Sequence, residues 1–471
     1  MKKRFSVSFC LLTTLGLSGC ALFPAQFEQS YTPTLPTQWV QSASINQEGF
    51  LEEPSVWWKR WSDEDLLQLI EATLSNNTDI LVAQSNLRSA QANVISANSV
   101  FFPSASVGAD ASQRRTDDRT TESYGADAGA SWSLNFGGRD LANRRVASLN
   151  ASSRALLLEE TKNAMTAEVA STYVRLCLAK KKLDIAKRSL QSYEEAKQLT
   201  QWRHQAGLVE ATDAEQAIAQ FESAKASVAS FEHAIFEYQT ALSRLTLLPL
   251  EDIRSIALQT IPVPPTGIAV SIPANVLEQR PDVQAAKQDV VAAMENIRVA
   301  QAAYWPTLSL SGSIGTTAAT VSALGASGTG VGALVAALSM PILNWGDIYA
   351  STEKQKANLD KVLAQYRQKV VDVLSETENA LSAMKTSERR QASLARATQS
   401  SELAAQLALQ QYSSGLSDYQ TVLSTQRSLL NAQETQAANM ADWAIAHINL
   451  YKTLGGGWKP ASTTGEVNEE N

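Results

Sequence analysis

The chain is poor in cysteine and histidine, and each scarcity excludes a class of structure. Only three cysteines occur among its 471 residues, at positions 10, 20 and 177. These are too few and too isolated for the disulfide framework that many exported domains carry. The three histidines show no metal-ligand spacing, either with one another or with Cys177. We therefore expect no disulfide scaffold and no metal site.

Motifs for catalysis and for helical membrane insertion are also missing. The chain has no Walker A motif, no dinucleotide-binding glycine motif and no nucleophile elbow. After residue 20 no uninterrupted apolar run reaches the 18 residues that would suggest a transmembrane helix. The longest candidate, Gly332–Leu343, is broken by Ser339 and Pro341. We expect no enzyme, no catalytic residue, no bound cofactor and no transmembrane helix.

Positive charge is scarce as well. With 40 basic and 47 acidic side chains, the formal net charge is −7. Loss of the first 19 residues would remove Lys2, Lys3 and Arg4 and no acid, which brings the charge to −10. Nucleic acid and anionic lipid surfaces need clustered cations, so neither is expected as the main partner.

The N-terminus has the pattern of a removable export signal, residues 1–19. Three basic residues precede the apolar stretch Phe5–Leu17, which is too short to span a bilayer. Leu17-Ser18-Gly19-Cys20 resembles a bacterial lipobox. The resemblance implies that Cys20 becomes the first mature residue and carries diacylglycerol and an N-acyl chain, and Ala21 favours delivery to the outer membrane. An ordinary secretory signal followed by a chance cysteine is the alternative.

A long internal repeat organises the rest of the chain. Residues 77–80 match residues 280–283, and residues 101–104 match 304–307. In both copies the Asp and the Pro of these motifs are 24 residues apart. Conserved spacing of this kind predicts a tandem duplication. The expected segments are an N-terminal extended segment anchored at its lipidated end (20–62), a first repeat (63–250), a Pro-rich linker (251–272), a second repeat (273–455) and a tail (456–471).

Each repeat is expected to contain a helix, two strands, a very long helix, a turn and a last helix. Pro103 and Pro306 end the leading helices, and the first of these helices is expected to break near residues 75–77. Residues 124–136 then alternate apolar and polar side chains, as in a strand with two different faces. We expect one hairpin over 104–136, with a solvated loop at 113–123. A second hairpin is expected over 307–343, with strands at 307–315 and 332–342.

Two very long helices are predicted after the hairpins. Residues 139–206 and 347–414 contain neither Pro nor Gly, and 68 helical residues would measure about 100 Å. Seven-residue spacing of Val169, Leu176, Leu183 and Leu190 predicts packing against neighbouring helices with a left-handed supercoil. Leu416, Leu423 and Leu430 repeat this spacing in the last helix.

Four amphipathic strands are too few to close a membrane barrel alone. Lipid does not tolerate open sheet edges, and transmembrane barrels need about eight strands or more. The strands have the length of tilted membrane strands, and aromatic residues stand at their helix-facing ends, where an interfacial belt would lie. These aromatic residues are Trp132, Phe136, Tyr304, Trp305 and Trp345. We therefore expect several copies of the chain to combine their strands into one closed barrel. The alternative from the pattern is a soluble hairpin pair.

Taken together, the motifs resemble the TolC-like outer-membrane efflux protein family, in its NodT-type lipoprotein branch. The segments that carry the resemblance are Trp57-Trp58, Leu66-Leu67, Ile272-Pro273, residues 280–283, residues 306–310 and residues 454–458. The resemblance implies a mainly α fold with a transmembrane β part and a homotrimer with a 12-stranded β-barrel and a 12-helix periplasmic α-barrel. It also implies outer-membrane lipid, a periplasmic adaptor and an inner-membrane transporter as partners.

The same resemblance implies where the adaptor docks. The family places its helix-turn-helix tips around a Gly-Leu pair, which here is found in Gly207-Leu208-Val209 and in Gly415-Leu416-Ser417. Glycine suits such a turn because it accepts a positive φ angle. An exposed leucine beside it would be an anchor for the adaptor, whereas the plain alternative is a helix C-cap followed by a core leucine.

A periplasmic gate is implied near these tips. The family often carries Leu-Asp-Ala-Gln-Arg there, and this chain has Leu423-Ser424-Thr425-Gln426-Arg427, so Ser424 stands in place of the acid. Asp418, Asp213 and Glu210 lie nearby in sequence and could attract cations or pair with Arg427. Solvated helix charge is an equally good interpretation of these three acids.

The functional hypothesis is therefore an outer-membrane exit duct of a tripartite efflux pump, extending into the periplasm. It would passively conduct drugs or other toxic compounds from the periplasm to the exterior. Two alternatives remain: a periplasmic coiled-coil lipoprotein that serves as a structural rod, and an outer-membrane duct for type I protein secretion. The rod would have no use for the apolar strand face with its aromatic ends.

Overall fold

The computed structural model describes residues 26, 28–40, 54–117, 119–256, 260–265, 276 and 280–456. Cys20 and the expected signal and tail motifs lie outside these residues, apart from the start of the tail at Gly456. The chain divides into two compact units. One unit comprises residues 1–32, 87–154 and 285–367 and contains the sheet. The other comprises residues 33–86, 155–284 and 368–471 and contains the ends of the long helices.

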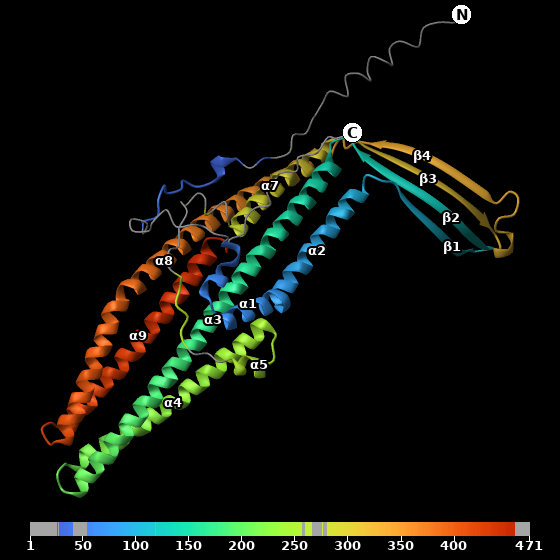
Figure 1. Ribbon diagram of the computed structural model, residues 1–471. Coiled ribbons are helices and arrows are strands. Elements are labelled where there is room, and N and C mark those ends of the chain that lie inside the picture. The colour runs from blue at the N-terminus through green and yellow to red at the C-terminus, as the bar shows by residue number, and fades with distance from the viewer. Residues whose placement is uncertain are drawn as a thin grey trace, which may run out of the picture. The chain divides into compact units, whose positions relative to one another are not determined.

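The described helices follow the predicted order in both repeats (Figure 1). The α-helices are α1 (Glu64–Asn76), α2 (Thr78–Ser99), α3 (Arg139–Gln205), α4 (Ala211–Thr246), α5 (Leu250–Ser255), α7 (Pro281–Gln301), α8 (Trp345–Ser413) and α9 (Tyr419–Thr453). Short 3-10 helices are η1 (Gln29–Tyr31), η3 (Pro54–Trp61), η4 (Ala302–Tyr304) and η5 (Val321–Ala323). No described helix is both long and apolar enough to cross a membrane.

The predicted helix break and the two long helices are confirmed. Asp63 caps α1 by accepting a hydrogen bond from the Leu66 N–H at 3.0 Å, and Asn77 separates α1 from α2. The long helices α3 and α8 run without interruption over 67 and 69 residues. Apart from Gly346 in the first turn of α8, these helices contain neither Pro nor Gly, which explains their length.

The four strands form one antiparallel sheet in the order β1-β2-β3-β4 (Figure 1). Strand β2 of the first repeat pairs with β3 of the second, so the two hairpins share one sheet. The register aligns Trp132 with Leu310 and Leu134 with Leu308, which makes one face apolar. The opposite face is mostly polar, with serine beside serine at positions 131 and 311.

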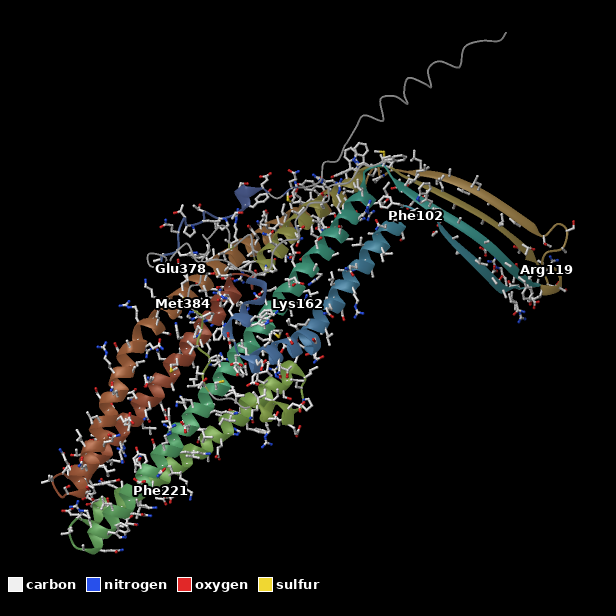
Figure 2. All side chains as sticks on the ribbon, viewed as in Figure 1. Phe102, Arg119, Lys162, Phe221, Glu378 and Met384 are labelled. Carbon is white, nitrogen blue, oxygen red and sulfur yellow. The ribbon has the colours of Figure 1, made fainter. Side chains whose placement is uncertain are left out.

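The prediction of a solvated loop at 113–123 is wrong. Strands β1 (Ser104–Thr116) and β2 (Arg119–Asn135) stay paired almost to their turn, and Arg119 lies at this end of the hairpin (Figure 2). Gln113 donates a hydrogen bond to Glu122 across the ladder at 3.1 Å. The threonines near the turn favour extended backbone, and cross-strand pairing compensates for the high local charge.

The second hairpin also differs from its prediction. Strand β3 (Thr307–Ala318) extends past residue 315, and β4 (Gly330–Ser339) ends before Pro341, which has no N–H to donate to a ladder. Val335 and Leu334 point to opposite faces of β4 and both are exposed. Apolar side chains on both faces explain why the alternation of this strand is weak in the sequence.

The main hydrophobic core lies in the unit that holds the helix ends. Val169 and Leu176 are buried there, as the seven-residue spacing predicts, whereas Leu183 and Leu190 are only half-buried. Trp57 stacks on Tyr451 with ring centroids 5.2 Å apart, which joins η3 to the end of α9. Leu416 is not part of the helical stripe, because α9 begins only at Tyr419.

Candidate functional site

Two turns at equivalent places in the repeats have the same backbone geometry. Gly207 and Gly415 have φ angles of +73° and +77°. Leu208 N–H donates to Arg203 O at 2.8 Å, and Leu416 N–H donates to Gln411 O at 2.9 Å. Each turn is a Schellman-type helix end, in which glycine takes the left-handed conformation at no steric cost.

The leucines that follow these glycines are exposed. Leu208 is 68% accessible and Leu416 is 80% accessible, so neither packs into the core of this chain. Their flanking residues Val209 and Ser417 are half-buried. The geometry is that of two rigid turns, each of which presents one apolar side chain, and such a side chain is suited to a pocket on a partner.

The three predicted gate acids have local structural contacts. Asp418 caps α9: its carboxylate accepts hydrogen bonds from Thr421 N–H at 2.8 Å and from the Thr421 hydroxyl at 2.6 Å. These bonds hold the pKa of Asp418 below its usual value. Glu210 stands at the equivalent position before α4 but makes no side-chain cap. Asp213, in the first turn of α4, is half-buried.

The other two gate candidates, Ser424 and Arg427, make different contacts. Ser424 is exposed and donates a hydrogen bond to Thr421 O, one turn back in its own helix, at 3.0 Å. Arg427 reaches from α9 to α4, where Gln220 Oε1 accepts hydrogen bonds from its Nη2 and Nε at 2.7 and 3.1 Å. In this single chain Arg427 therefore links two helices through a neutral partner.

A further contact near the tips was not anticipated. Arg203 of α3 donates a hydrogen bond to Tyr412 O of α8, and its guanidinium lies 4.6 Å from the centroid of the Tyr412 ring. The Tyr412 hydroxyl returns to α3, where it donates to Thr200 Oγ1 at 3.1 Å. Arg203 and Tyr412 thus connect the helix pair α3–α4 to the helix pair α8–α9. The sequence offers one indication of this contact: Arg203 occurs only in the first repeat, because the equivalent position of the second repeat is Gln411.

A second pair of equivalent contacts lies at the opposite ends of α4 and α9. In the first repeat Asn77 Nδ2 donates to Leu245 O at 2.8 Å, while Asn77 Oδ1 accepts from the Asp79 N–H at 2.9 Å. We call Asn77 and Leu245 the first clamp. It joins the start of α2 to the last turn of α4.

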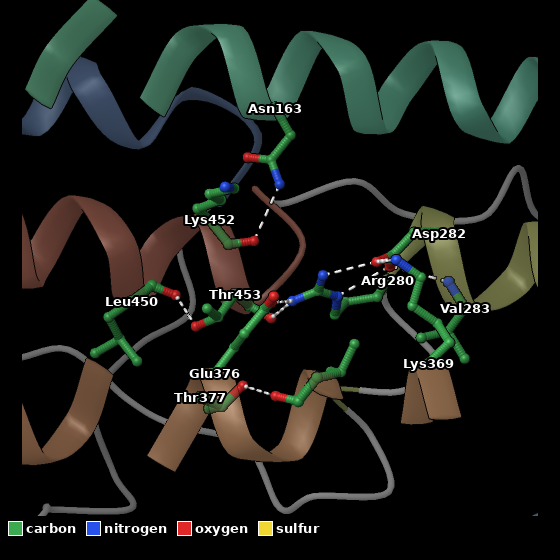
Figure 3. Close-up of polar contacts among 11 residues, drawn as sticks. Asn163, Arg280, Asp282, Val283, Lys369, Glu376, Thr377, Leu450, Lys452 and Thr453 are labelled. Carbon is green, nitrogen blue, oxygen red and sulfur yellow. Dashed lines mark hydrogen bonds and ion pairs between the residues drawn. The ribbon is translucent and has the colours of Figure 1, made fainter. Parts of the chain in front are cut away.

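The second clamp comprises Arg280, Asp282, Glu376 and Thr453 (Figure 3). Arg280 Nη1 donates to Thr453 O at 3.2 Å, in the last turn of α9. Its Nη2 and Nε pair with the two oxygens of Asp282 at 2.7 and 2.9 Å, and Nη1 also contacts Glu376 at 3.3 Å. Arg280 and Asp282 are each 4% exposed. Asn77 and Arg280 match in the repeat, and their acceptors are 208 residues apart, as are Gly207 and Gly415.

Glu160 of α3 lies beside the second clamp. Burial, and then the negative charge of Asp282, raise the pKa of its carboxyl to about 7, although Arg280, Lys452 and Lys369 oppose the shift. Among the described residues its buried Oε2 has no hydrogen-bond partner. Asp282 behaves in the opposite way, because hydrogen bonds from Arg280 hold its pKa below the usual value despite burial.

In the unit that contains the sheet, one face of the sheet is an exposed apolar surface. Val107, Ile314, Leu334 and Leu338 are all largely exposed on the face that also carries Trp132. The predicted aromatic belt residues Phe136, Trp305 and Trp345 are exposed too, and Tyr304 is half-buried. Large exposed apolar surfaces of this kind mark contact with lipid or with other chains. In the described part of the chain no His, Cys, Asp and Glu side chains gather into a metal-binding group.

Comparison with known proteins identifies relatives over nearly the whole chain. The sequence model of the family described as "Outer membrane efflux protein" matches residues 69–246 and 272–456. The pyoverdine export outer membrane protein OpmQ of Pseudomonas putida is 29% identical over 454 residues, which cover 92% of this chain and 96% of OpmQ. The toluene efflux pump outer membrane protein TtgC of Pseudomonas putida is 27% identical over 477 residues, covering 98% and 96% of the two chains.

Solved structures agree with this comparison. The outer-membrane channel OprN has a TM-score of 0.81 and 27% identity, over 93% of this chain and all of OprN. The CmeC outer membrane channel of Campylobacter jejuni has a TM-score of 0.82 over 93% of this chain and 96% of CmeC. At 22% identity, CmeC supports the fold alone.

Proposed function

The chain belongs to the outer membrane efflux protein family, and from that premise we propose that it forms the trimeric exit duct of a tripartite pump. It is an outer-membrane efflux component that extends into the periplasm. In this proposal the duct contributes no chemistry, and an inner-membrane transporter supplies the energy. The observation that carries the proposal is the pair of matched tips with exposed Leu208 and Leu416, which suits docking to a periplasmic adaptor.

The sheet supports the trimer. Strands β1 and β4 are the edges of the four-stranded sheet, and an open edge in lipid leaves backbone polar groups unpaired. Pairing β4 of one copy with β1 of the next closes a barrel of 12 strands from three copies and places the apolar face toward lipid. The rod alternative would leave this apolar face in water.

The adaptor proposal is tested at the tips. We expect Leu208→Asp together with Leu416→Asp to abolish drug resistance in a strain that lacks its own duct, because a charge cannot enter an apolar pocket unpaired. Trimer yield in the outer membrane should stay normal. Leu247→Asp is the matched control: this leucine is also exposed and follows a helix end, and Asp tolerates its left-handed backbone. Undiminished resistance in the double variant would refute the docking role.

We propose that the gate depends on contacts between the helix pairs α3–α4 and α8–α9. Charge around the tips comes from Asp213, Glu210, Asp418 and Arg427. Arg203 and Tyr412 connect α3 to α8. Loosening this connection should let the tips separate more readily. We expect Arg203→Gln to raise single-channel conductance in planar bilayers, whereas Arg396→Gln, at an exposed arginine that bonds within its own helix, should not. Equal conductance of wild type and Arg203→Gln would contradict the proposal.

Ser424 offers a second test of the gate. Ser424→Asp restores the acid that the family often has at this level. In a trimer it would place three carboxylates around the axis, so we expect stronger cation preference and altered conductance. An unchanged reversal potential in a salt gradient would remove residue 424 from the gate.

Lipidation of Cys20 is proposed to assist targeting without forming the pore. A Cys20→Ala variant with an ordinary cleavable signal should still give trimers in the outer membrane. Complete loss of trimers would show that the acyl chains are required for assembly. Labelling with radioactive palmitate distinguishes the lipobox interpretation from an ordinary signal.

A further inference from the structure

A groove between α3 and α9 has no role in the duct function described above. It has a volume of about 810 Å³, within the size range of sites for small molecules. One face of α3 forms one wall, with lining residues at positions 177, 180, 181, 184, 185 and 188. One face of α9 forms the other, at positions 433, 436, 437 and 440. Thr398 of α8 and residues 260, 261 and 263 complete the lining.

The floor of the groove is apolar and belongs to the main core. Ile185, Ile261 and Ala437 are buried members of the core cluster, and Met440 packs against it. An apolar ligand body laid here would cover carbon atoms of an existing core. Methionine adapts its shape readily, which suits a surface that accommodates a ligand.

The rim of the groove is positively charged, in contrast to the negative charge of the whole chain. Lys180, Lys181 and Arg188 line it against a single acid, Asp184. Arg188 and Lys181 both contact Asp184, at 2.7 and 3.6 Å. Among the lining residues, three cations stand against one carboxylate, which leaves a surplus of positive charge even though Asp65, outside the lining, also acts on Lys180.

Lys180 is the cation best placed to receive an anion. Its ammonium donates a hydrogen bond to Ile256 O at 3.4 Å, and a backbone carbonyl carries no full negative charge. Burial lowers the pKa of Lys180, which indicates that the site disfavours the ammonium as it stands, although Cys177 and Asp65 oppose the shift. An anionic head group would add a directly contacting charged partner to the carbonyl oxygen that Lys180 now contacts.

We propose that the groove between α3 and α9 binds a small anionic amphiphile, with its acidic head at Lys180 and its apolar body along Ile185, Ile261 and Met440. The charge surplus specifies the sign of the head, and the buried floor specifies the apolar body. The volume allows one drug-sized molecule in each chain. The site is distinct from the exposed tips.

The test uses the full-length trimer in nanodiscs of zwitterionic lipid, with empty nanodiscs as blank. The probe is anilinonaphthalene sulfonate, and phenylnaphthylamine, which has a closely similar ring system without the sulfonate, is its neutral control. We expect saturable binding of one sulfonate probe per chain and much weaker binding of the neutral probe. Lys180→Gln should weaken sulfonate binding about fivefold or more.

Two further variants keep the result interpretable. Gln436→Glu adds one carboxylate to the wall of the groove with little change of shape, and should also weaken sulfonate binding. Lys187→Gln is the matched control, because Lys187 lies on α3 outside the lining and pairs with Glu232 at 3.6 Å. Absence of saturable binding, equal affinity for both probes, or equal loss in Lys180→Gln and Lys187→Gln would each overturn the proposal.

Discussion

The two clamps perform the same structural task with different chemistry. Each attaches the residue directly before α2 or α7 to a carbonyl oxygen in the last turn of α4 or α9, respectively. The first clamp uses the neutral amide of Asn77. The second uses the guanidinium of Arg280, which is buried together with Asp282.

The difference shows what a buried charge requires of its surroundings. Asn77 satisfies its amide with Leu245 O and with the backbone of α2, and it needs no ionised neighbour. Arg280 needs a carboxylate in α7, Asp282, and a second one in α8, Glu376, because an unpaired buried cation is strongly unfavourable. The charged clamp therefore connects three helices, α7, α8 and α9, whereas the neutral clamp connects the start of α2 to the end of α4.

The largest effect is expected from breaking the charged clamp. Asp282→Ala leaves Arg280 buried without its bidentate partner and should reduce the free energy of unfolding by about 3–5 kcal/mol. The measurement is thermal unfolding of the purified trimer, followed by tryptophan fluorescence. Glu353→Ala, which removes an exposed helix-surface pair with Lys356, is the control and should leave the melting temperature nearly unchanged. Equal shifts in the two variants would contradict the role of burial.

The next effect is a pH dependence that arises from Glu160, beside the second clamp. The folded-state pKa of Glu160, about 7, lies above its usual 4.5, so the folded chain binds this proton more tightly than the unfolded chain. The stabilisation is complete below about pH 4.5 and is lost as the pH rises toward 7, by up to about 3 kcal/mol. Glu160→Gln should flatten the melting temperature across this window. Asn77→Ala should keep the wild-type slope, and a slope that persists in Glu160→Gln would assign it to other groups.

Breaking the neutral clamp should have a smaller effect. Asn77→Ala removes the cap of α2 and leaves Leu245 O without its donor, a loss of about 2 kcal/mol. Asn77→Ser separates the two contributions, because a serine hydroxyl keeps a cap acceptor for α2 without the Nδ2 amide donor and without a charge. A loss in Asn77→Ala as large as in Asp282→Ala would show that charge is not what distinguishes the clamps.

The smallest effect concerns the caps at the two tips. Asp418 caps α9 with its side chain, whereas Glu210 makes no such bond before α4. Asp418→Ala should lower the melting temperature slightly, and Glu210→Ala should leave it unchanged. The hydrogen bonds from Thr421 also keep Asp418 ionised at acidic pH, so its contribution should decrease only when the pH falls below the usual range of aspartate. Equal effects of the two variants would remove this asymmetry between the repeats.

Much of the fold was predictable because it depends on local pattern. The lack of Pro and Gly over residues 139–206 predicts an uninterrupted helix, and α3 occupies nearly all of it. Alternation over 124–136 predicts β2 in the same way. The pattern failed at 113–123, where charged residues suggested a loop and pairing with the neighbouring strand formed a ladder instead. The domain boundaries and the functions of the tip residues stay predictions.

The candidate site was predictable only in part. Gly207 and Gly415 identify both turns, since a left-handed backbone position favours glycine wherever it occurs. The contact of Arg203 with Tyr412 and both clamps join residues 168 to 209 positions apart in sequence. Local periodicity carries no information about such partners, although the repeat places Asn77 and Arg280 in equivalent positions.

By itself the sequence determined most of the segments that become helix, strand or turn, and that the second half repeats the first. These features depend on residue spacing and backbone preference within a short stretch of chain. The tertiary structure alone decided that β2 pairs with β3, that Arg280 is buried against Thr453, and that Leu208 and Leu416 remain exposed. Pairing and burial depend on which distant side chains reach the same place, and only the packed chain brings them there.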